Sequence, residues 1–167
     1  MKKLLMISAL TLLSTIAFSQ EYKYHPIFIY NFSKYIEWPA VDKDEFVITV
    51  VGNDMAYREM LDIVEKKKTL KNRKLVVKKS KSINDAGTSD VLFVTKSEKL
   101  SPSEVKAQQK QGTLIITEHN DMAETASHIN FILTKDSKIG FELNSALAEA
   151  AGLKVSNSLA GLAKKTY

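Results

Sequence analysis

The stretch FVITVVG (residues 46–52) decides the fold. It is an almost unbroken run of apolar, mostly β-branched residues that ends in glycine. Such a run predicts a strand buried on both faces, which is the usual environment in a parallel sheet. Residues 90–95 (DVLFVT) and 113–118 (TLIITE) repeat the pattern, and residues 74–80 hold another strand with LVV at its centre. The sequence therefore predicts four strands of a mostly parallel sheet.

Helix signals precede the first strand and follow it. Residues 24–38 predict a helix that ends at Pro39, because proline cannot donate a backbone hydrogen bond. After the first strand, Asn53 or Asp54 is expected to cap a second helix by accepting from its unpaired N–H groups. The expected apolar faces are Phe28, Phe32, Tyr35 and Ile36 in the first helix, and Tyr57, Met60, Leu61 and Val64 in the second.

A third helix has a strong start signal before the last predicted parallel strand. Ser101 can cap it, Pro102 suits the first helical position, and Glu104 can complete a capping box. Gly112 is its expected stop. Strands and helices that alternate in this way predict right-handed crossovers in a parallel sheet.

The pattern changes in the last third of the chain. Residues 129–134 and 139–144 are strand-like runs joined by a turn-rich link, which predicts an antiparallel hairpin. Two short helices follow. Asn144 or Ser145 caps the first, which stops at Gly152; Ser156 or Asn157 starts the second, with Leu159, Leu162 and Ala163 on one side. The predicted fold class is α/β, with a mostly parallel central sheet, helices on both faces and this C-terminal hairpin.

The first 19 residues predict a signal peptide. Lys2 and Lys3 precede an uncharged, largely apolar run of 15 residues (4–18), and small residues at 17 and 19 place cleavage before Gln20. The run is shorter than the ~20 residues of a membrane-spanning helix, although an uncleaved anchor is the rival interpretation. We expect an exported, most simply periplasmic, protein whose residues 20–167 form one domain.

Composition and motifs exclude several kinds of chemistry. With 0 cysteines, the chain has no disulfide, thiolate metal site or thiol nucleophile. It contains no phosphate-binding glycine loop, nucleophile elbow or H-E-x-x-H pair. We therefore predict no catalytic residue, no cofactor and no resident metal.

Charge is uneven along the chain. The formal net charge is +5, and residues 66–81 hold nine basic residues and no acidic one. The simpler interpretation is a solvated helix end and strand face. The functional interpretation is a patch for anionic lipid head groups or an acidic partner. Nucleic acid is not expected as a partner of an exported protein.

Polar residues follow three of the predicted parallel strands. They are Asn53 and Asp54, then Lys96 and Ser97, then the cluster 118–121 around His119. Because ligands of open α/β sheets bind at the carboxyl ends of strands, these loops are a candidate ligand or metal site. The alternative is ordinary turn chemistry, which favours the same residue types.

Three other features have two interpretations each. Glu142 and Asn144 point to one face of the predicted hairpin, as a partner groove or as a solvent face. Trp38 is a core residue or an interface anchor. His25 precedes a proline and is expected at a solvent-exposed helix start.

Several blocks resemble the YfiR-like family of exported bacterial proteins. The most specific are IYNFSKYIEWP (residues 29–39) and the FELN strand (141–144), and further blocks follow in the family's order over nearly all of the mature chain. The resemblance implies a periplasmic repressor that binds the sensor part of an inner-membrane diguanylate cyclase and tends to dimerise. The family's cysteine-based redox control cannot operate here. Recurrent family positions are matched by Asn31, Trp38, Arg73, Phe141 and Asn144.

The leading hypothesis is thus a regulatory binding protein that contacts the periplasmic domain of a membrane-anchored signalling protein and affects cyclic-di-GMP-linked biofilm behaviour, with a homodimer as a further expectation. The alternative is a small-molecule binding lobe of a periplasmic sensing or transport system. A hydrolase is the third and weakest, since motifs supply no nucleophile, base and orienting group.

Overall fold

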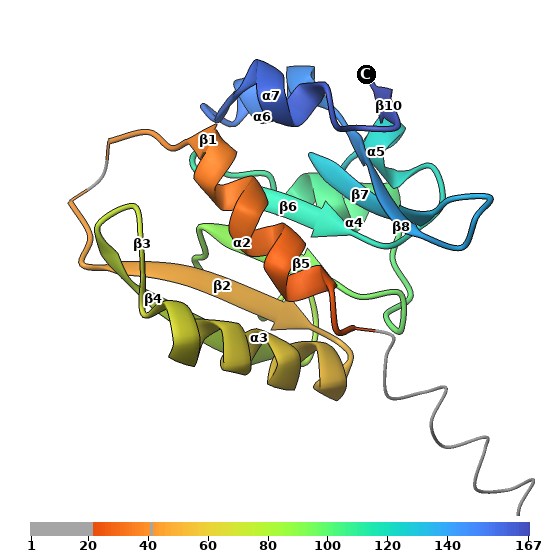
Figure 1. Ribbon diagram of the computed structural model, residues 1–167. Helices are drawn as coiled ribbons and strands as arrows, with labels where there is room; N and C mark the ends of the chain where they lie inside the picture. The colour runs from red at the N-terminus through yellow and green to blue at the C-terminus, as the bar shows by residue number, and fades with distance from the viewer. Residues whose placement is uncertain (1–21, 41) are drawn as a thin grey trace, which may run out of the picture.

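Strand β2 (Glu45–Val51) lies inside an eight-stranded sheet of order β10-β8-β7-β6-β5-β2-β4-β3 (Figure 1). The computed structural model describes residues 22–40 and 42–167. β2 pairs in parallel with β4 (Arg73–Ser80) and β5 (Val91–Val94), and β5 pairs in parallel with β6 (Leu114–Thr117). The four predicted parallel strands are confirmed.

The two ends of the sheet are built differently. At one end, β7 (Ile129–Leu133) and β8 (Ile139–Leu143) form the predicted antiparallel hairpin, and β10 (Lys165–Thr166) pairs in parallel with β8. At the other end, β3 (Thr69–Leu70) pairs with the start of β4. The mixed α/β fold class is confirmed, but two-residue strands such as β3 and β10 have no sequence pattern and were not predicted.

Of the helices that the structure describes, the two longest cover one face of the sheet, and α4 lies behind it on the other (Figure 1). These two are α2 (His25–Tyr35) and α3 (Asp54–Lys67). The remaining helices are short, and α6 and α7 lie together beyond the hairpin end of the sheet. Their bounds are Pro102–Ala107 for α4, Met122–Thr125 for α5, Ser145–Ala150 for α6 and Asn157–Ala160 for α7.

Successive residues of β2 enter two different hydrophobic clusters, because side chains alternate across a strand. Val50 packs in the cluster under α2 and α3, whereas Val51 packs in the cluster on the other face, and both are fully buried. The first cluster also contains Phe93 and Phe131, and the second contains Val105 of α4. The continuous apolar run thus follows from burial on both faces.

The predicted helix caps are confirmed. The side chain of Asn53 accepts from the N–H groups of Met55 and Ala56, at 2.8 and 3.3 Å. Ser101 and Glu104 form both halves of the capping box. Asn144 accepts from Leu147 N–H at 2.9 Å, and Ser156 caps α7.

The predicted end of the first helix was wrong, and its predicted face was right for Phe32 and Ile36 but wrong for Tyr35. α2 ends at Tyr35 rather than Trp38, because Ile36 and Glu37 form β1 (Ile36–Glu37) and pair with β9 (Lys154–Val155). Tyr35 is 48% exposed, whereas Ile29 is fully buried. The neighbouring residues Phe28 and Ile29 belong to two overlapping apolar stripes, and packing against the sheet selects the stripe of Ile29, Phe32, Ser33 and Ile36.

Two predictions for the other helices were also wrong. α4 ends at Ala107, well before Gly112. α7 ends at Ala160, so that Leu162 falls outside it and is 65% exposed. Both segments are too short for a periodic pattern to define their ends.

Candidate functional site

The carboxyl ends of the parallel strands converge as predicted. Thr95 follows β5, and its hydroxyl donates to Val51 O at 3.1 Å and accepts from Asn53 N–H at 3.0 Å. Gly52 makes this approach possible, since its φ is +99° and a Cβ there would lie 2.4 Å from Thr95 Oγ1. Ser97 completes the contact, with its hydroxyl 2.9 Å from that of Thr95.

Glu118, at the end of β6, is the centre of a second contact between these loops. One of its oxygens lies 2.7 Å from His25 Nε2 at the start of α2, and both side chains are only 8% exposed. The other oxygen accepts from the Tyr22 hydroxyl and from Lys96 N–H, each at 3.1 Å. Both carboxylate oxygens are therefore engaged, and the cluster joins three segments distant in sequence.

The expected exposure of His25 was wrong, since the residue is 6% exposed. Its ring packs edge-on against Phe131, with 4.6 Å between centroids, and stacks at 6.0 Å on Phe93. The partner carboxylate, Glu118, lies 93 positions along the chain, so local sequence indicated only a helix start. His25 and Tyr22 were the members of the cluster that sequence reasoning missed, while Glu118 fell in the polar stretch singled out.

His119 stands beside Glu118 and bridges to the loop after β5. Its Nε2 lies 2.7 Å from Glu98 O, and since a carbonyl accepts, Nε2 carries the proton. Its backbone N–H donates to Asn130 Oδ1 at 2.9 Å, and the same oxygen accepts from Thr117 Oγ1 at 2.7 Å. The buried Nδ1 atoms of His119 and His25 have no hydrogen-bond partner among the described residues.

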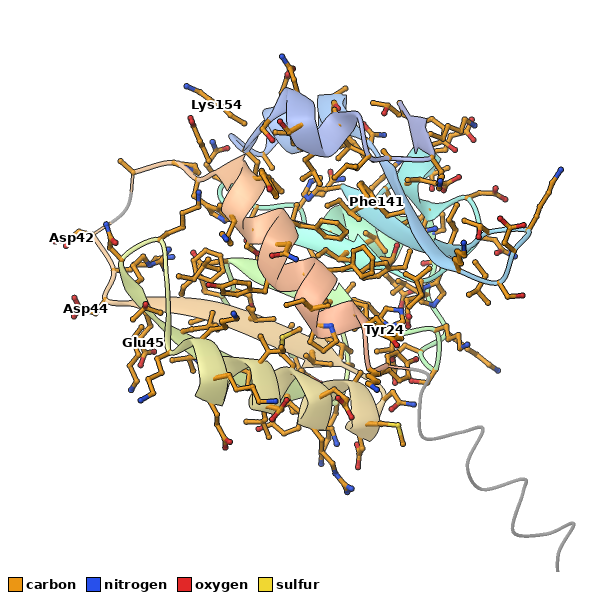
Figure 2. The ribbon with its side chains drawn as sticks, viewed as in Figure 1. Tyr24, Asp42, Asp44, Glu45, Phe141 and Lys154 are labelled. Atoms are coloured by element: carbon orange, nitrogen blue, oxygen red, sulfur yellow. The ribbon has the colours of Figure 1, made fainter. Side chains whose placement is uncertain are left out.

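An open groove of about 1230 Å³ runs from these strand ends between the start of α2 and the hairpin β7–β8. Tyr24 and Leu133, which are 52% and 72% exposed, both line it, and Figure 2 shows Tyr24 at the start of α2. The groove thus combines apolar side chains with polar ones at the strand ends and at the hairpin turn. Its remaining lining residues are His25, Phe28, Lys96, Glu118, His119, Asn120, Phe131, Ile132, Ser137, Lys138 and Ile139.

Of the residues singled out from the sequence, Lys96 and His119 line this groove, whereas Ser97 contacts Thr95 and is not among the lining residues. Asn53 is engaged as a helix cap, and Asp54 forms an ion pair with Lys79. Within residues 22–40 and 42–167, no group of three or more His, Asp or Glu side chains is arranged to hold a metal ion.

Arg73 and Trp38 lie at the opposite, amino ends of the strands. The Arg73 guanidinium makes two parallel 2.9 Å hydrogen bonds to Asp90, and its carbon lies 5.2 Å from the centre of the Phe46 ring. Trp38 packs edge-on against the same ring at 5.1 Å. Asp90 also accepts from Val47 N–H at 2.8 Å, so that this cluster joins β2, β4 and the start of β5.

The last three predicted residues lie elsewhere. Asn31 is half-buried on α2, and Glu142 is half-buried on β8 opposite Asn130. Asn144 is 6% exposed, caps α6 and donates to Ala123 O at 2.9 Å. Its amide is therefore fully used within the fold. Phe141, on the opposite face of β8, packs beneath α2 at 4.7 Å from Phe32 (Figure 2).

Residues 22–164 match the family described as YfiR/HmsC-like. The chain belongs to the YfiR/HmsC-like family. Membership suggests a periplasmic regulatory role. No curated protein matches the chain.

One solved structure similar to this YfiR/HmsC-like chain is the crystal structure of a conserved domain protein from Vibrio cholerae O1 biovar El Tor strain N16961. The two share 13% sequence identity and a TM-score of 0.50 over 88% of this chain. The chain spans 60% of the length of that protein. The likeness concerns the fold alone.

The predicted signal peptide (residues 1–19) lies outside the described residues. Among the helices that the structure describes, none has the length and apolar character needed to cross a bilayer.

Proposed function

We propose that this protein regulates a membrane-anchored signalling protein by binding its periplasmic domain through the groove. The observation that carries the proposal is the groove itself, in which Leu133 is 72% exposed beside a polar end. Large apolar side chains gathered at a surface are typical of protein contact sites. The family supplies the expected partner class, a diguanylate cyclase or a similar sensor, and hence an effect on biofilm behaviour.

The mechanism is a shift of the partner's conformational equilibrium. A regulator acts on its partner only through a difference in affinity for the partner's two states. The groove suits this role because one wall, α2, is joined to the strand ends through the buried His25–Glu118 contact. A rigid wall of this kind favours the partner state that fits it and disfavours the other.

This proposal includes the two predictions that concern the whole chain. Residues 1–19 direct export and are removed, and residues 20–167 act as one domain in the periplasm. Mass spectrometry of the protein from a periplasmic fraction should give an N-terminus at Gln20. The intact leader on protein from the cytoplasm would contradict it. A homodimer is also expected, and sedimentation velocity of the mature protein measures it directly.

Site-specific photocross-linking tests the groove. A photoreactive residue at Leu133 should cross-link in cells to one integral membrane protein. Leu162 is the matched control, since it is 65% exposed but is not part of the groove. We expect no cross-link to that membrane protein from position 162, and Leu133→Glu should abolish the regulatory phenotype while Leu162→Glu preserves it. Equal cross-linking from both positions would overturn the groove as the contact site.

A small-molecule ligand is the second candidate function. It is favoured by the lining of the groove, which combines polar side chains such as His119 and Lys96 with apolar ones such as Phe28. A metabolite with a polar group beside an apolar body would suit such a groove. Thermal-shift screening tests this, because a ligand stabilises by RT ln(1 + [L]/Kd). His119→Phe should remove the response, and a flat response across metabolites would leave the protein partner as the function.

A further inference from the structure

The outer edge of β4 is open over most of its length. β4 pairs with β2 from Lys74 to Ser80, but β3 covers it only at Arg73 and Lys74. Beyond these two residues, no described strand pairs with the outer side of β4. We refer to residues 76–80 as the β4 edge. Its length is close to that of an average strand of five to six residues.

Two residues of the β4 edge turn their backbone groups outward. Lys74 N–H bonds to Asp44 O on the β2 side, whereas Leu75 N–H bonds to Lys68 O on the outer side, each at 2.8 Å. Because backbone groups of a strand alternate between its two neighbours, Val77 and Lys79 continue the outward series. They present N–H donors and carbonyl acceptors in the pattern that a strand needs.

The charge around the β4 edge is strongly positive. Residues 66–81 contain nine basic residues and no acidic one. Arg73 and Lys79 have carboxylate partners, Asp90 and Asp54, and Lys66 pairs with Asp62. The following lysines are exposed and have no carboxylate partner among the described residues: Lys68, Lys71, Lys78 and Lys81.

We propose that the β4 edge binds an extended acidic polypeptide segment by strand addition. Backbone hydrogen bonds to Val77 and Lys79 would provide affinity, and the surrounding lysines would select acidic side chains. Pairing of β4 with β4 of a second copy is disfavoured, because it would bring the lysines of the two edges together. Lysines on an edge ordinarily prevent self-association, and the same charges attract an acidic strand.

This surface is separate from the groove. In the sheet order, β4 stands four places from β7 and five from β8, and the groove is lined by the hairpin and the strand-end loops. A groove partner and an acidic strand would therefore bind to different regions. The inference goes beyond the proposed function and does not depend on it.

Peptide binding to the full mature protein tests the proposal. The probe is a fluorescent octapeptide of alternating glutamate and valine, measured by anisotropy. Its control is the same peptide with alternate backbone nitrogens methylated, which retains the charge but cannot donate to a strand. We expect saturable binding of the probe and at least about tenfold weaker binding of the methylated control, because backbone bonds provide the affinity of strand addition. The amides of Val77 and Lys79 should exchange hydrogen more slowly when the probe is bound.

Matched charge reversals locate the binding site. Lys78→Glu/Lys81→Glu should weaken probe binding about tenfold, because the peptide then meets like charge. The control Lys106→Glu/Lys110→Glu makes the same change in net charge on and after α4, and should leave binding within about twofold. Equal effects of the two pairs would overturn the proposal, since attraction would then depend on net charge alone.

Two other outcomes also overturn it. Equal binding of the probe and its methylated control would show a charged patch without strand addition. Binding to phosphatidylglycerol vesicles that depends on Lys78 and Lys81, without binding of the probe, would assign the surface to lipid. A groove variant, Leu133→Glu, should bind the probe normally. The proposal for the β4 edge and the proposal for the groove can therefore be contradicted independently of each other.

Discussion

The two ends of the central sheet each carry a buried ion pair, and the two pairs differ in chemistry. At the amino ends of the strands, Arg73 and Asp90 are joined by two parallel 2.9 Å hydrogen bonds. At the carboxyl ends, His25 and Glu118 meet through one contact of 2.7 Å. Among the described residues, each pair leaves one nitrogen without a hydrogen-bond partner, Arg73 Nε in the first and His25 Nδ1 in the second.

The difference separates a structural site from a candidate functional one. A guanidinium fits a carboxylate with two parallel bonds, so the Arg73–Asp90 pair holds the starts of the strands in a fixed geometry. The imidazole of His25 reaches Glu118 through one nitrogen only and lies at the wall of the groove. The end of the sheet that borders the groove is therefore the one whose buried pair has a single contact.

The largest expected effect is the loss of stability when the Arg73–Asp90 pair is broken. Arg73→Met should lower the free energy of unfolding by roughly 3–5 kcal/mol, because Asp90 is left buried without its charge partner. Urea denaturation measures it. Lys74→Met is the control, since that side chain is 74% exposed and lies 3.9 Å from Glu45, and it should cost under about 1 kcal/mol. A small loss for Arg73→Met would show that the hydrogen bond from Val47 N–H is enough to stabilise the buried carboxylate of Asp90.

The next effect is a loss of stability in acid that is caused by His128. Burial lowers the pKa of His128 to about 4 from 6.5. Between these values the unfolded chain binds a proton that the folded chain does not, so stability is complete above pH 6.5 and falls as the pH drops toward 4. The loss should reach about 3 kcal/mol.

Urea denaturation at several pH values tests this assignment. His128 Nδ1 accepts from Ile115 N–H at 2.8 Å, and the carboxamide oxygen of His128→Asn can take its place. In that variant, most of the acid-dependent loss in the free energy of unfolding should disappear. A variant with an unchanged pH dependence would show that the burial of His128 is not the cause of the acid destabilisation.

Removal of the His25–Glu118 contact should lower the free energy of unfolding less than removal of the Arg73–Asp90 pair. His25→Phe keeps the ring contacts with Phe131 and Phe93 but removes the contact to Glu118. We expect a loss of about 2 kcal/mol in the free energy of unfolding, because Tyr22 and Lys96 still donate to Glu118. A loss as large as that of Arg73→Met would show that both buried pairs serve the stability of the fold.

The smallest effect is expected at the exposed side of the groove. Leu133→Glu and Leu162→Glu should each change the free energy of unfolding by less than about 0.5 kcal/mol, because both side chains are largely exposed. Thermal unfolding of both variants checks this. A strongly destabilised Leu133→Glu would show that this leucine serves the fold and would weaken its role in partner binding.

Local patterns predicted the elements whose causes are local. The run at residues 46–52 became β2 because burial on both faces requires an unbroken apolar stretch. Asn53, Ser101 and Asn144 became caps because a side-chain oxygen satisfies N–H groups two or three residues away. The convergence of the strand-end loops also followed, since parallel strands end at one edge.

Long-range contacts decided what the local patterns missed. α2 stops at Tyr35 because β9, more than 110 residues further on, offers a strand partner to Ile36. In the sequence, Arg73 was one of the nine basic residues of the stretch 66–81 and did not differ from its exposed neighbours. Only the fold brings Asp90 next to it. The same holds for Leu162, whose exposure reflects where α7 ends.

By itself, the sequence determined the parallel α/β sheet, the hairpin, the helix caps and the resemblance to the family, because each depends on residues that are neighbours in the chain. Only the tertiary structure decided that His25 is buried against Glu118 and that a groove lies between α2 and the hairpin. The physical reason is that a buried charge is stable only with its partner, and that partner is 93 residues away.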